Sequence, residues 1–350
     1  MTTIVFASCM SAPRDPKQEV WRDAATHKPQ WLVLAGDNIY MDYWPNLEEP
    51  RKWPVADFAG FMYQQYSSQF AVPSFRKLVS AIPAGQVIGV WDDHDFAWND
   101  CYGTELVDGM PEKRLVAHAL FQHYFAALNL RPLPAVLPAM ALSNVLTLPT
   151  ATRPIYRALD MAPLRVLLCD VRSYREDRRL DRASASLLGD EQEKWLLAEI
   201  AAATSPLLIV SGSVLVAAGD QSWDFFRNFY EQRFLPAVRQ RRVLFIGGDI
   251  HRNRLLPVPP GHPVEVVSSA AALGFPYTGL RNFGVLEVSG SEASIFLYRR
   301  GEIQYSGRFA FDSGIFKTSV SALAAQAVPR STVKRAEAQK VAALRGLAAK

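Results

Sequence analysis

The chain has 350 residues, of which 49% are hydrophobic and 21% charged, a balance that excludes an intrinsically disordered chain. No run of eighteen apolar residues is present, and the N-terminal segment lacks the basic start and long apolar run of a secretory signal. The three cysteines are widely spaced, which argues against a disulfide framework and against a structural zinc site. We therefore expect a cytoplasmic protein.

The formal net charge of +4 is unevenly distributed. Residues 318–350 contain six basic residues and one acidic residue, whereas residues 1–317 contain 32 basic and 33 acidic residues. The sequence thus predicts a near-neutral domain over 1–317 and a basic, Ala-rich helical tail over 318–350. An amphipathic tail of this kind is more typical of a helix packed on the body than of a nucleic-acid or membrane contact.

Short apolar runs rich in β-formers recur along the chain and predict strands. They are Ile4–Ala7, Trp31–Ala35, Val87–Trp91, Arg165–Cys169, Leu207–Val210, Val243–Ile246, Val264–Val267, Gly284–Val288 and Ser294–Tyr298. Helical patterns lie between several of them, over Pro16–His27, Ala56–Ser80, Glu112–Leu128, Asp190–Ala203 and Trp223–Arg239. This alternation predicts an α/β fold with a covered central sheet, and the close spacing of the last runs predicts antiparallel strands at its end.

The Pro-rich stretch Arg131–Pro163 is compatible with a domain linker or with a long excursion inside one domain. The strand pattern resumes unchanged after it, which favours the excursion.

Polar groups follow six of the predicted strands, at the point where each strand ends. The segments are Ser8-Cys9, Gly36–Tyr40, Asp92–Asp95, Asp170–Arg172, Ser211–Ser213 and Gly248–His251. Parallel strands bring such ends to one edge of the sheet, where α/β proteins bind their ligands. The carboxylates gathered there would repel one another unless cations neutralised them, so the pattern predicts a site for two metal ions and metal-assisted hydrolysis.

In order and spacing, several motifs resemble those of PhoD-like alkaline phosphatase D, a branch of the metallophosphoesterases. They are FASC (6–9), GDNIY (36–40), WDDHD (91–95), DVRSYR (170–175), LLGDEQEKWL (187–196), GGDIH (247–251) and VEVVSS (264–269). The resemblance spans about residues 4–310. It implies a four-layer α/β/β/α sandwich with mixed, mostly parallel sheets. It also implies a dinuclear or larger metal centre that contains Fe(III) with Ca or another divalent ion (Mn, Mg or Zn).

The resemblance also implies roles for individual residues. Cys9 would bind the first metal as a thiolate, Asp37 would bridge the metals, and Tyr40 would bind iron as a phenolate. Asp93 with Asp92, and Asp249 with His251, match further ligand motifs. His94 would contact the phosphate and protonate the leaving oxygen, and Arg172 with Arg175 would bind the phosphate. Asn99 is a further polar candidate for substrate binding.

Two departures from exported family members weaken a role in extracellular phosphate scavenging. The first motif begins at Phe6, without the N-terminal extension of those proteins, and Asn38 stands where an aromatic residue is frequent. Neither departure touches the expected metal ligands.

The expected activity is hydrolysis of a phosphate ester by a metal-bound hydroxide. Two alternatives stay open: a phosphodiesterase acting on a lipid, nucleotide or polymer, and a non-catalytic metal-binding protein. A nucleophile elbow (GxSxG) and a P-loop lysine motif (GK[ST]) are both missing from the sequence, which argues against those two classes of hydrolase. The sequence offers no sign of nucleic-acid or transmembrane partners and does not indicate an oligomeric state.

Overall fold

The computed structural model of the protein describes residues 1–42, 50–141, 143, 155–177, 181–256, 262–274, 277 and 279–318. The helical tail predicted for 318–350 lies outside this part of the chain, except for Thr318 at its start. Among the residues described, no helix combines the length and the apolar character needed to cross a bilayer.

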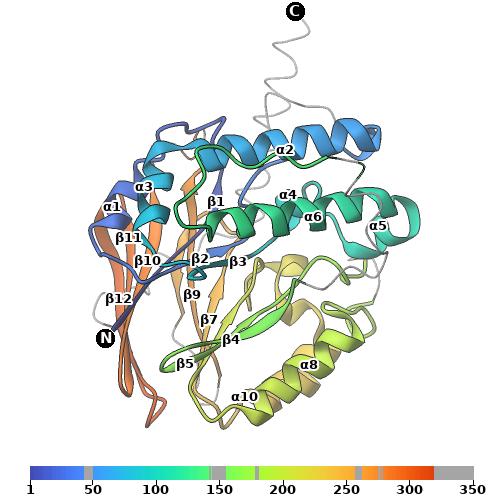
Figure 1. Ribbon diagram of the computed structural model, residues 1–350. Coiled ribbons are helices and arrows are strands. Elements are labelled where there is room, and N and C mark those ends of the chain that lie inside the picture. Colours follow the sequence, from blue (N-terminus) through green and yellow to red (C-terminus); the bar gives the residue numbers. More distant parts are fainter. Residues whose placement is uncertain are drawn as a thin grey trace, which may run out of the picture.

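Thirteen strands of the described chain form one mixed sheet, and β1 lies at its centre (Figure 1). The strands are β1 (Thr2–Met10), β2 (Trp31–Ala35), β3 (Val87–Val90), β4 (Arg157–Met161), β5 (Leu164–Leu168), β6 (Leu207–Val210), β7 (Val243–Gly247), β8 (Asn253–Leu255), β9 (Val264–Ala272), β10 (Asn282–Ser289), β11 (Glu292–Arg299), β12 (Glu302–Ala310) and β13 (Phe316–Thr318). The first half of β1 pairs in parallel with β2 and antiparallel with β10, whereas its end pairs in parallel with β9. Because β1 has all three neighbours, the two halves of the sheet are hydrogen-bonded to each other.

Parallel pairing is confined to the centre of each half. The order β1-β2-β3 is parallel in one half, and β9-β7-β6-β5 is parallel in the other. Antiparallel pairing adds β10 to β13 on one side, β4 beside β5, and β8 beside β9. The antiparallel end of the sheet, predicted from the closely spaced last runs, is confirmed.

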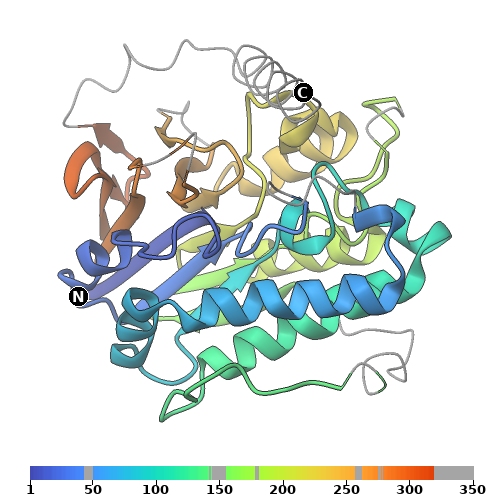
Figure 2. The ribbon, with the colours of Figure 1, turned by 90° about the horizontal axis from the view of Figure 1, so that it is seen from above.

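The described helices cover the parallel strands of both halves (Figures 1 and 2). Those before β5 are α1 (Val20–Ala25), η1 (Pro50–Lys52), α2 (Val55–Ala71), α3 (Pro73–Ala81), α4 (Asp93–Phe96), α5 (Gly103–Gly109) and α6 (Pro111–Leu128). Those after β5 are α8 (Gly189–Ala202), η2 (Gly219–Gln221), η3 (Trp223–Phe225), α9 (Arg227–Phe229), η4 (Tyr230–Phe234) and α10 (Leu235–Val238).

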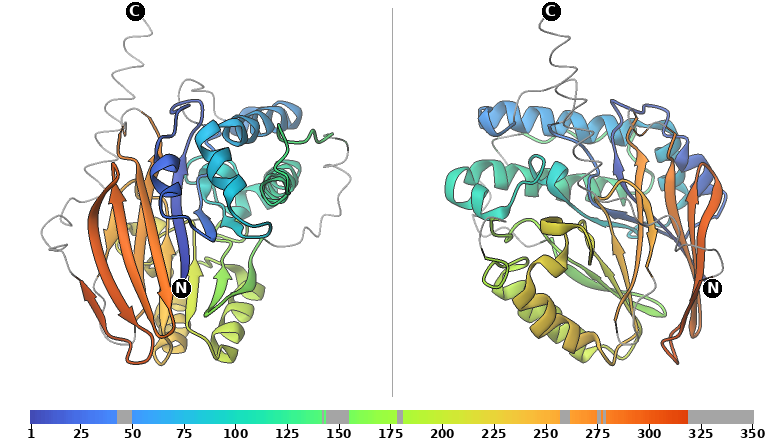
Figure 3. Two further views of the ribbon diagram at one scale, coloured as in Figure 1. Left: turned by 60° about the vertical axis from the view of Figure 1, so that its left-hand side comes forward. Right: turned by 180° about the vertical axis from the view of Figure 1, so that it is seen from behind.

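Three apolar clusters hold these parts together. The first joins α1, α2, α3 and α6 to β1–β3, the second lies between the two halves of the sheet, and the third joins α8 and the segment 223–238 to β5–β7. The views from two sides show β10–β12 standing apart from the long helices (Figure 3). The predicted α/β class with a covered mixed sheet is confirmed, while a strict sandwich of four separate layers stays a prediction.

The structure differs from two of the predicted elements and adds a strand that was not predicted. The helix expected over Ala56–Ser80 is interrupted before Pro73, where Val72 is extended, because residues that precede proline avoid the helical conformation. The single helix expected over Trp223–Arg239 is a series of short 3-10, α and π turns. The Pro-rich stretch contains β4, which pairs with β5.

Candidate metal centre

The ends of β2, β3, β6 and β7 meet at one place because glycines let their backbones approach closely. A Cβ added to Gly212 would lie 2.4 Å from the carbonyl oxygen of Trp91, and one added to Gly248 would lie 2.2 Å from that of Ala35. Any side chain at these two positions would therefore push the strand ends apart. The expectation that polar strand ends gather at one edge is met by this contact.

Cys9 reaches the site through an irregularity in β1. The register between β1 and β9 shifts between Ser8 and Met10, and Cys9 lies at that shift with a φ of 63°. Asp37, Asp249 and His251 also have positive φ. Left-handed backbone is costly for such residues and concentrates at functional sites, where it redirects side chains.

The first group of potential metal ligands consists of Cys9, Asp37 and His251, whose ligand atoms all lie within 4.8 Å of one another. The Cys9 thiol is 3.2 Å from Asp37 Oδ2 and 3.1 Å from Ser269 Oγ. The Tyr40 hydroxyl donates to Asp37 Oδ2 at 3.1 Å and lies 3.3 Å from His251 Nε2. Four of the expected metal ligands, Cys9, Asp37, Tyr40 and His251, thus lie close together.

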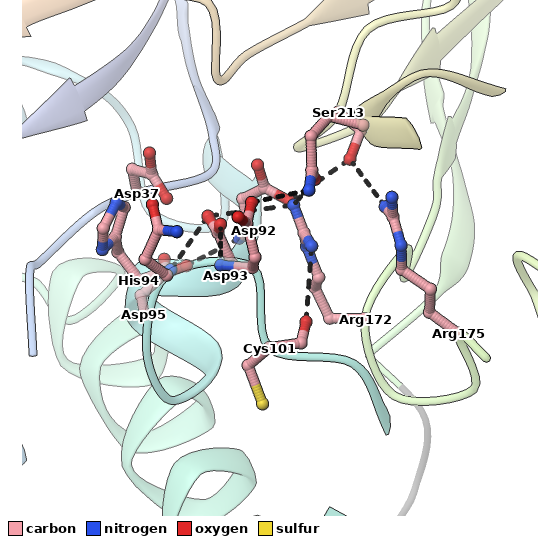
Figure 4. Close-up of polar contacts among 12 residues, drawn as sticks. Asp37, Asp92, Asp93, His94, Asp95, Cys101, Arg172, Arg175 and Ser213 are labelled. Carbon is pink, nitrogen blue, oxygen red and sulfur yellow. Dashed lines mark hydrogen bonds and ion pairs between the residues drawn. The ribbon is translucent and has the colours of Figure 1, made fainter. Parts of the chain in front are cut away.

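The second group consists of Asp37, Asp93 and His94, so Asp37 belongs to both groups. His94 Nδ1 lies 2.6 Å from Asp42 Oδ1, and the His94 ring packs on that of Tyr40 at 4.2 Å between centroids. Figure 4 shows Asp37 and His94 side by side. Asp37 is thus the residue that the two groups share.

The segment that carries Asp93 and His94 is fixed by a capping box at the start of α4. Asp92 accepts from the backbone of Asp95, and the Asp95 carboxylate accepts the Asp92 N–H at 2.6 Å. The backbone N–H of Asn38 also donates to Asp95, and its side-chain amide donates to Asp95 and to the Val90 carbonyl. Burial raises the pKa of Asp95 to about 7, although these bonds from Asn38 oppose the shift. Asn38 therefore ties the end of β2 to the WDDHD segment.

The electrostatics of the site fit a bound cation. Burial raises the pKa of Asp37 well above its usual range; His94 opposes this shift and the neighbouring carboxylate Asp93 adds to it. Burial and the charge of Asp37 likewise raise the pKa of Cys9 and of Tyr40. Asp37 Oδ1 is buried without a hydrogen-bond partner among the described residues. A positive ion would stabilise these ionised forms and give that oxygen a partner.

Neighbouring carboxylates affect His94, a base, in the opposite way, because they favour its charged form. Burial lowers the pKa of His94, but Asp42, Asp93 and Asp37 outweigh it and raise that pKa well above the ordinary value. These carboxylates therefore favour the charged form of the ring.

Arg172 forms a second network, on the far side of Asp92 and Asp93 (Figure 4). Its side chain is fully buried; Nε donates to Asp92 Oδ1 at 2.5 Å, and Nη2 lies 3.8 Å from Asp93 Oδ1. Nη1 donates to the Cys101 carbonyl at 3.3 Å, and Nη2 donates to Gln221 Oε1 at 3.1 Å. Burial raises the pKa of Asp92 to about 6, and the adjacent Arg172 opposes this shift.

The remaining candidates lie outside the two ligand groups. Asp92 and half-buried Asp249 belong to neither group. The buried Arg175 guanidinium packs over the Phe226 ring at 5.1 Å and donates to Ser213 Oγ at 3.5 Å. Asn99 is exposed, and its backbone N–H donates to Asp42 Oδ2 at 2.6 Å.

Sequence reasoning missed two residues that touch the site. Asp42, two positions after Tyr40, holds His94 and the backbone of Asn99. Ser269, the last residue of VEVVSS, contacts the Cys9 thiol and accepts from the backbone N–H of His251 at 3.0 Å. Ser269 lies within a motif already singled out, whereas a lone aspartate after Tyr40 gives no comparable signal.

Both the sequence and the structure are similar to those of known phosphatases. A model of the PhoD-like phosphatase family matches residues 4–274, while a comparison with curated proteins gives no match. The structure is similar to a dimetal phosphatase from Danio rerio, with 14% identity, 89% of this chain and 99% of that chain covered, and a TM-score of 0.52. It is also similar to a phosphoesterase from E. coli, with 12% identity, coverage of 89% and 100%, and a TM-score of 0.30. At this identity the Danio rerio likeness shows a shared fold.

Proposed function

The chain belongs to the PhoD-like phosphatase family and is a hydrolase of phosphoric ester bonds, and from this premise we propose that two metal ions bind around Asp37 and carry the reaction. The observation that supports this proposal most directly is the position of Asp37 in both ligand groups. Its Oδ1 is buried and has no hydrogen-bond partner in the described chain.

The donor types suggest how the ions are distributed. Cys9, Tyr40 and His251 would hold the first ion together with Asp37, and a thiolate with a phenolate favours Fe(III). Asp93 would join Asp37 at the second ion, where carboxylate oxygens suit Ca or another hard divalent ion. Asp249 follows Gly248, which packs against Ala35 and Gly212 at the strand ends, and its charge affects the pKa of Asp92; we include it as a further proposed ligand of the second ion.

His94 is proposed to protonate the leaving oxygen of the ester. The ions, when bound, supply hydroxide at neutral pH and neutralise charge on the phosphoryl oxygens. His94 would complete this chemistry because Asp42 fixes its ring and raises its pKa.

Arg172 and Asp92 are proposed to act as a positioning pair. A guanidinium that binds a phosphate directly needs an N–H facing the substrate, whereas Arg172 is fully buried and each of its three nitrogens has a protein acceptor. We assign Arg172 to hold the WDDHD segment, and through it Asp93 and His94, in place. Arg175, buried against Phe226, would support the same segment through Ser213.

The test is a comparison of ester classes with the purified, metal-loaded protein. We expect turnover of an aryl phosphomonoester that exceeds turnover of the matching diester, together with iron and a second metal in elemental analysis. A chelator should abolish the activity. Faster diester turnover would reassign the enzyme as a phosphodiesterase, and metal-bound protein without activity on either ester would contradict the proposal.

A further inference from the structure

A cavity of about 460 Å³ lies beside the metal centre, and Tyr40 belongs to both. Its walls come from the segment after β1 (Ser11, Arg14), from α2 (Phe61, Gln64, Ser68) and from the α2–α3 junction. The Tyr40 hydroxyl bonds to Asp37 and its ring packs on His94, so Tyr40 links the cavity wall to the metal centre.

The segment that forms one wall of this cavity is firmly attached to α2 and α3. Gln18 and Gln69 exchange hydrogen bonds between their side-chain amides at 2.8 and 2.9 Å, and the Ser74 hydroxyl donates to the Gln18 carbonyl at 3.0 Å. A Cβ on Gly274 would lie 2.6 Å from the Arg14 carbonyl oxygen, so this segment also packs closely on the turn after β9. The cavity is therefore a preformed feature of the fold, as ligand sites are in general.

The size and lining of the cavity indicate the kind of molecule that it fits. Its volume lies within the range of about 300–1,000 Å³ that is typical of sites for organic ligands. Phe61 and several small apolar residues offer an apolar surface, while Gln64, Gln65 and Ser68 offer neutral hydrogen-bonding groups. Arg14 is the one charged residue among the described lining residues, and none of these is acidic.

We propose that this cavity binds the alcohol part of the phosphate ester, and that it selects an aromatic-sized alcohol without positive charge. The proposal rests on the proposed function, because it needs the phosphoryl group to be held at the metal centre. Phe61 and the neighbouring apolar residues would contact an aromatic ring, and the side chains of Gln64 and Ser68 would bond to its substituents. Among the described lining residues the one charged group is the Arg14 guanidinium, which disfavours a cationic alcohol.

The test blocks the cavity and compares a large with a small ester. Ser68→Trp places an indole in the cavity, and Gln64→Trp places one there from an exposed position of α2. The matched control is Ser80→Trp, at an exposed position of α3 that does not line the cavity. The substrates are 1-naphthyl phosphate and methyl phosphate, with KM and kcat measured for the metal-loaded wild type and for each variant.

We expect Ser68→Trp and Gln64→Trp to raise the KM for 1-naphthyl phosphate at least tenfold while the KM for methyl phosphate changes less than twofold. Ser80→Trp should change neither value. If both blocking variants keep the wild-type ratio of kcat/KM for the two esters, the cavity does not bind the alcohol, although the proposed function stands. If the wild type hydrolyses neither ester, the proposed function fails and this inference fails with it.

Discussion

Asp42 shows how a single side chain sets the chemistry of the site. Its carboxylate holds His94 Nδ1 at 2.6 Å and accepts the backbone N–H of Asn99 at the same distance. The negative charge of Asp42 is the largest of the contributions that raise the pKa of His94 against the effect of burial. If His94 donates the proton, as proposed, it is active only while protonated, and Asp42 would extend the pH range of activity toward alkaline pH.

Replacing Asp42 with asparagine should therefore move the alkaline limb of the pH–rate profile to lower pH, by about one unit or more. We also expect kcat to fall, because the ring loses its fixed orientation, while the metal content stays that of the wild type. The matched control is Asp57→Asn at an exposed position of α2. An alkaline limb that does not move in Asp42→Asn would show that His94 is not the proton donor.

At the scale of secondary structure elements, the closeness of the strand ends depends on Gly212. A methyl group there would meet the Trp91 carbonyl oxygen at 2.4 Å and the Asp92 Cβ at 2.8 Å. Gly212→Ala should therefore destabilise the fold by about 1–3 kcal/mol, as overpacking does elsewhere, and should lower activity by displacing Asp92. Urea unfolding measures the first effect.

Gly60 supplies the control for this substitution. It lies within α2, and a Cβ added there has nothing within 4 Å. Gly60→Ala should stabilise the protein by roughly 0.5–1 kcal/mol through helix propensity alone. If Gly212→Ala were as stable as the wild type, the strand ends would not depend on the close contact at Gly212.

The strands at the centre of the sheet were predictable because burial on both faces makes them continuous apolar runs. Trp31–Ala35 and Leu207–Val210 were predicted with the bounds that the structure gives to β2 and β6. The edge strand β4 carries the exposed Arg157 and Asp160 and so lacks a continuous apolar run. Local sequence patterns also fail to predict the close approach of the strand ends. From the sequence alone a glycine such as Gly212 indicates only a turn, because its neighbours in space are not known.

The candidate site, like the fold, could be predicted from the sequence only in part. Residues in strand-end motifs, such as Asp37 and His251, could be found from the sequence because parallel strands carry their ends to one edge. The positive φ of Cys9 and the pairing of Asp92 with Arg172 depend on contacts between segments about 80 residues apart or more, so the sequence pattern could not supply them.

At the scale of the whole molecule, the two halves of the sheet are joined through β1 and supply different parts of the site. The half that contains β2 and β3 carries Asp37, Asp93 and His94, and the half that contains β7 and β9 leads to His251 and Ser269. Cys9, at the end of β1, stands where the halves meet. The candidate metal centre therefore draws on both halves of the sheet, and Asp37 belongs to both ligand groups.

The most direct test of this account is the metal content and activity of Asp37→Asn. The wild type should hold about two ions per chain. Asp37→Asn should lose metal and should hydrolyse an aryl phosphate more than about 100-fold more slowly, beyond the loss typical of residues that only support a ligand. Asp57→Asn should match the wild type in both measurements. Full metal content with near-normal hydrolysis in Asp37→Asn would contradict the central claim that this carboxylate joins two metal ions.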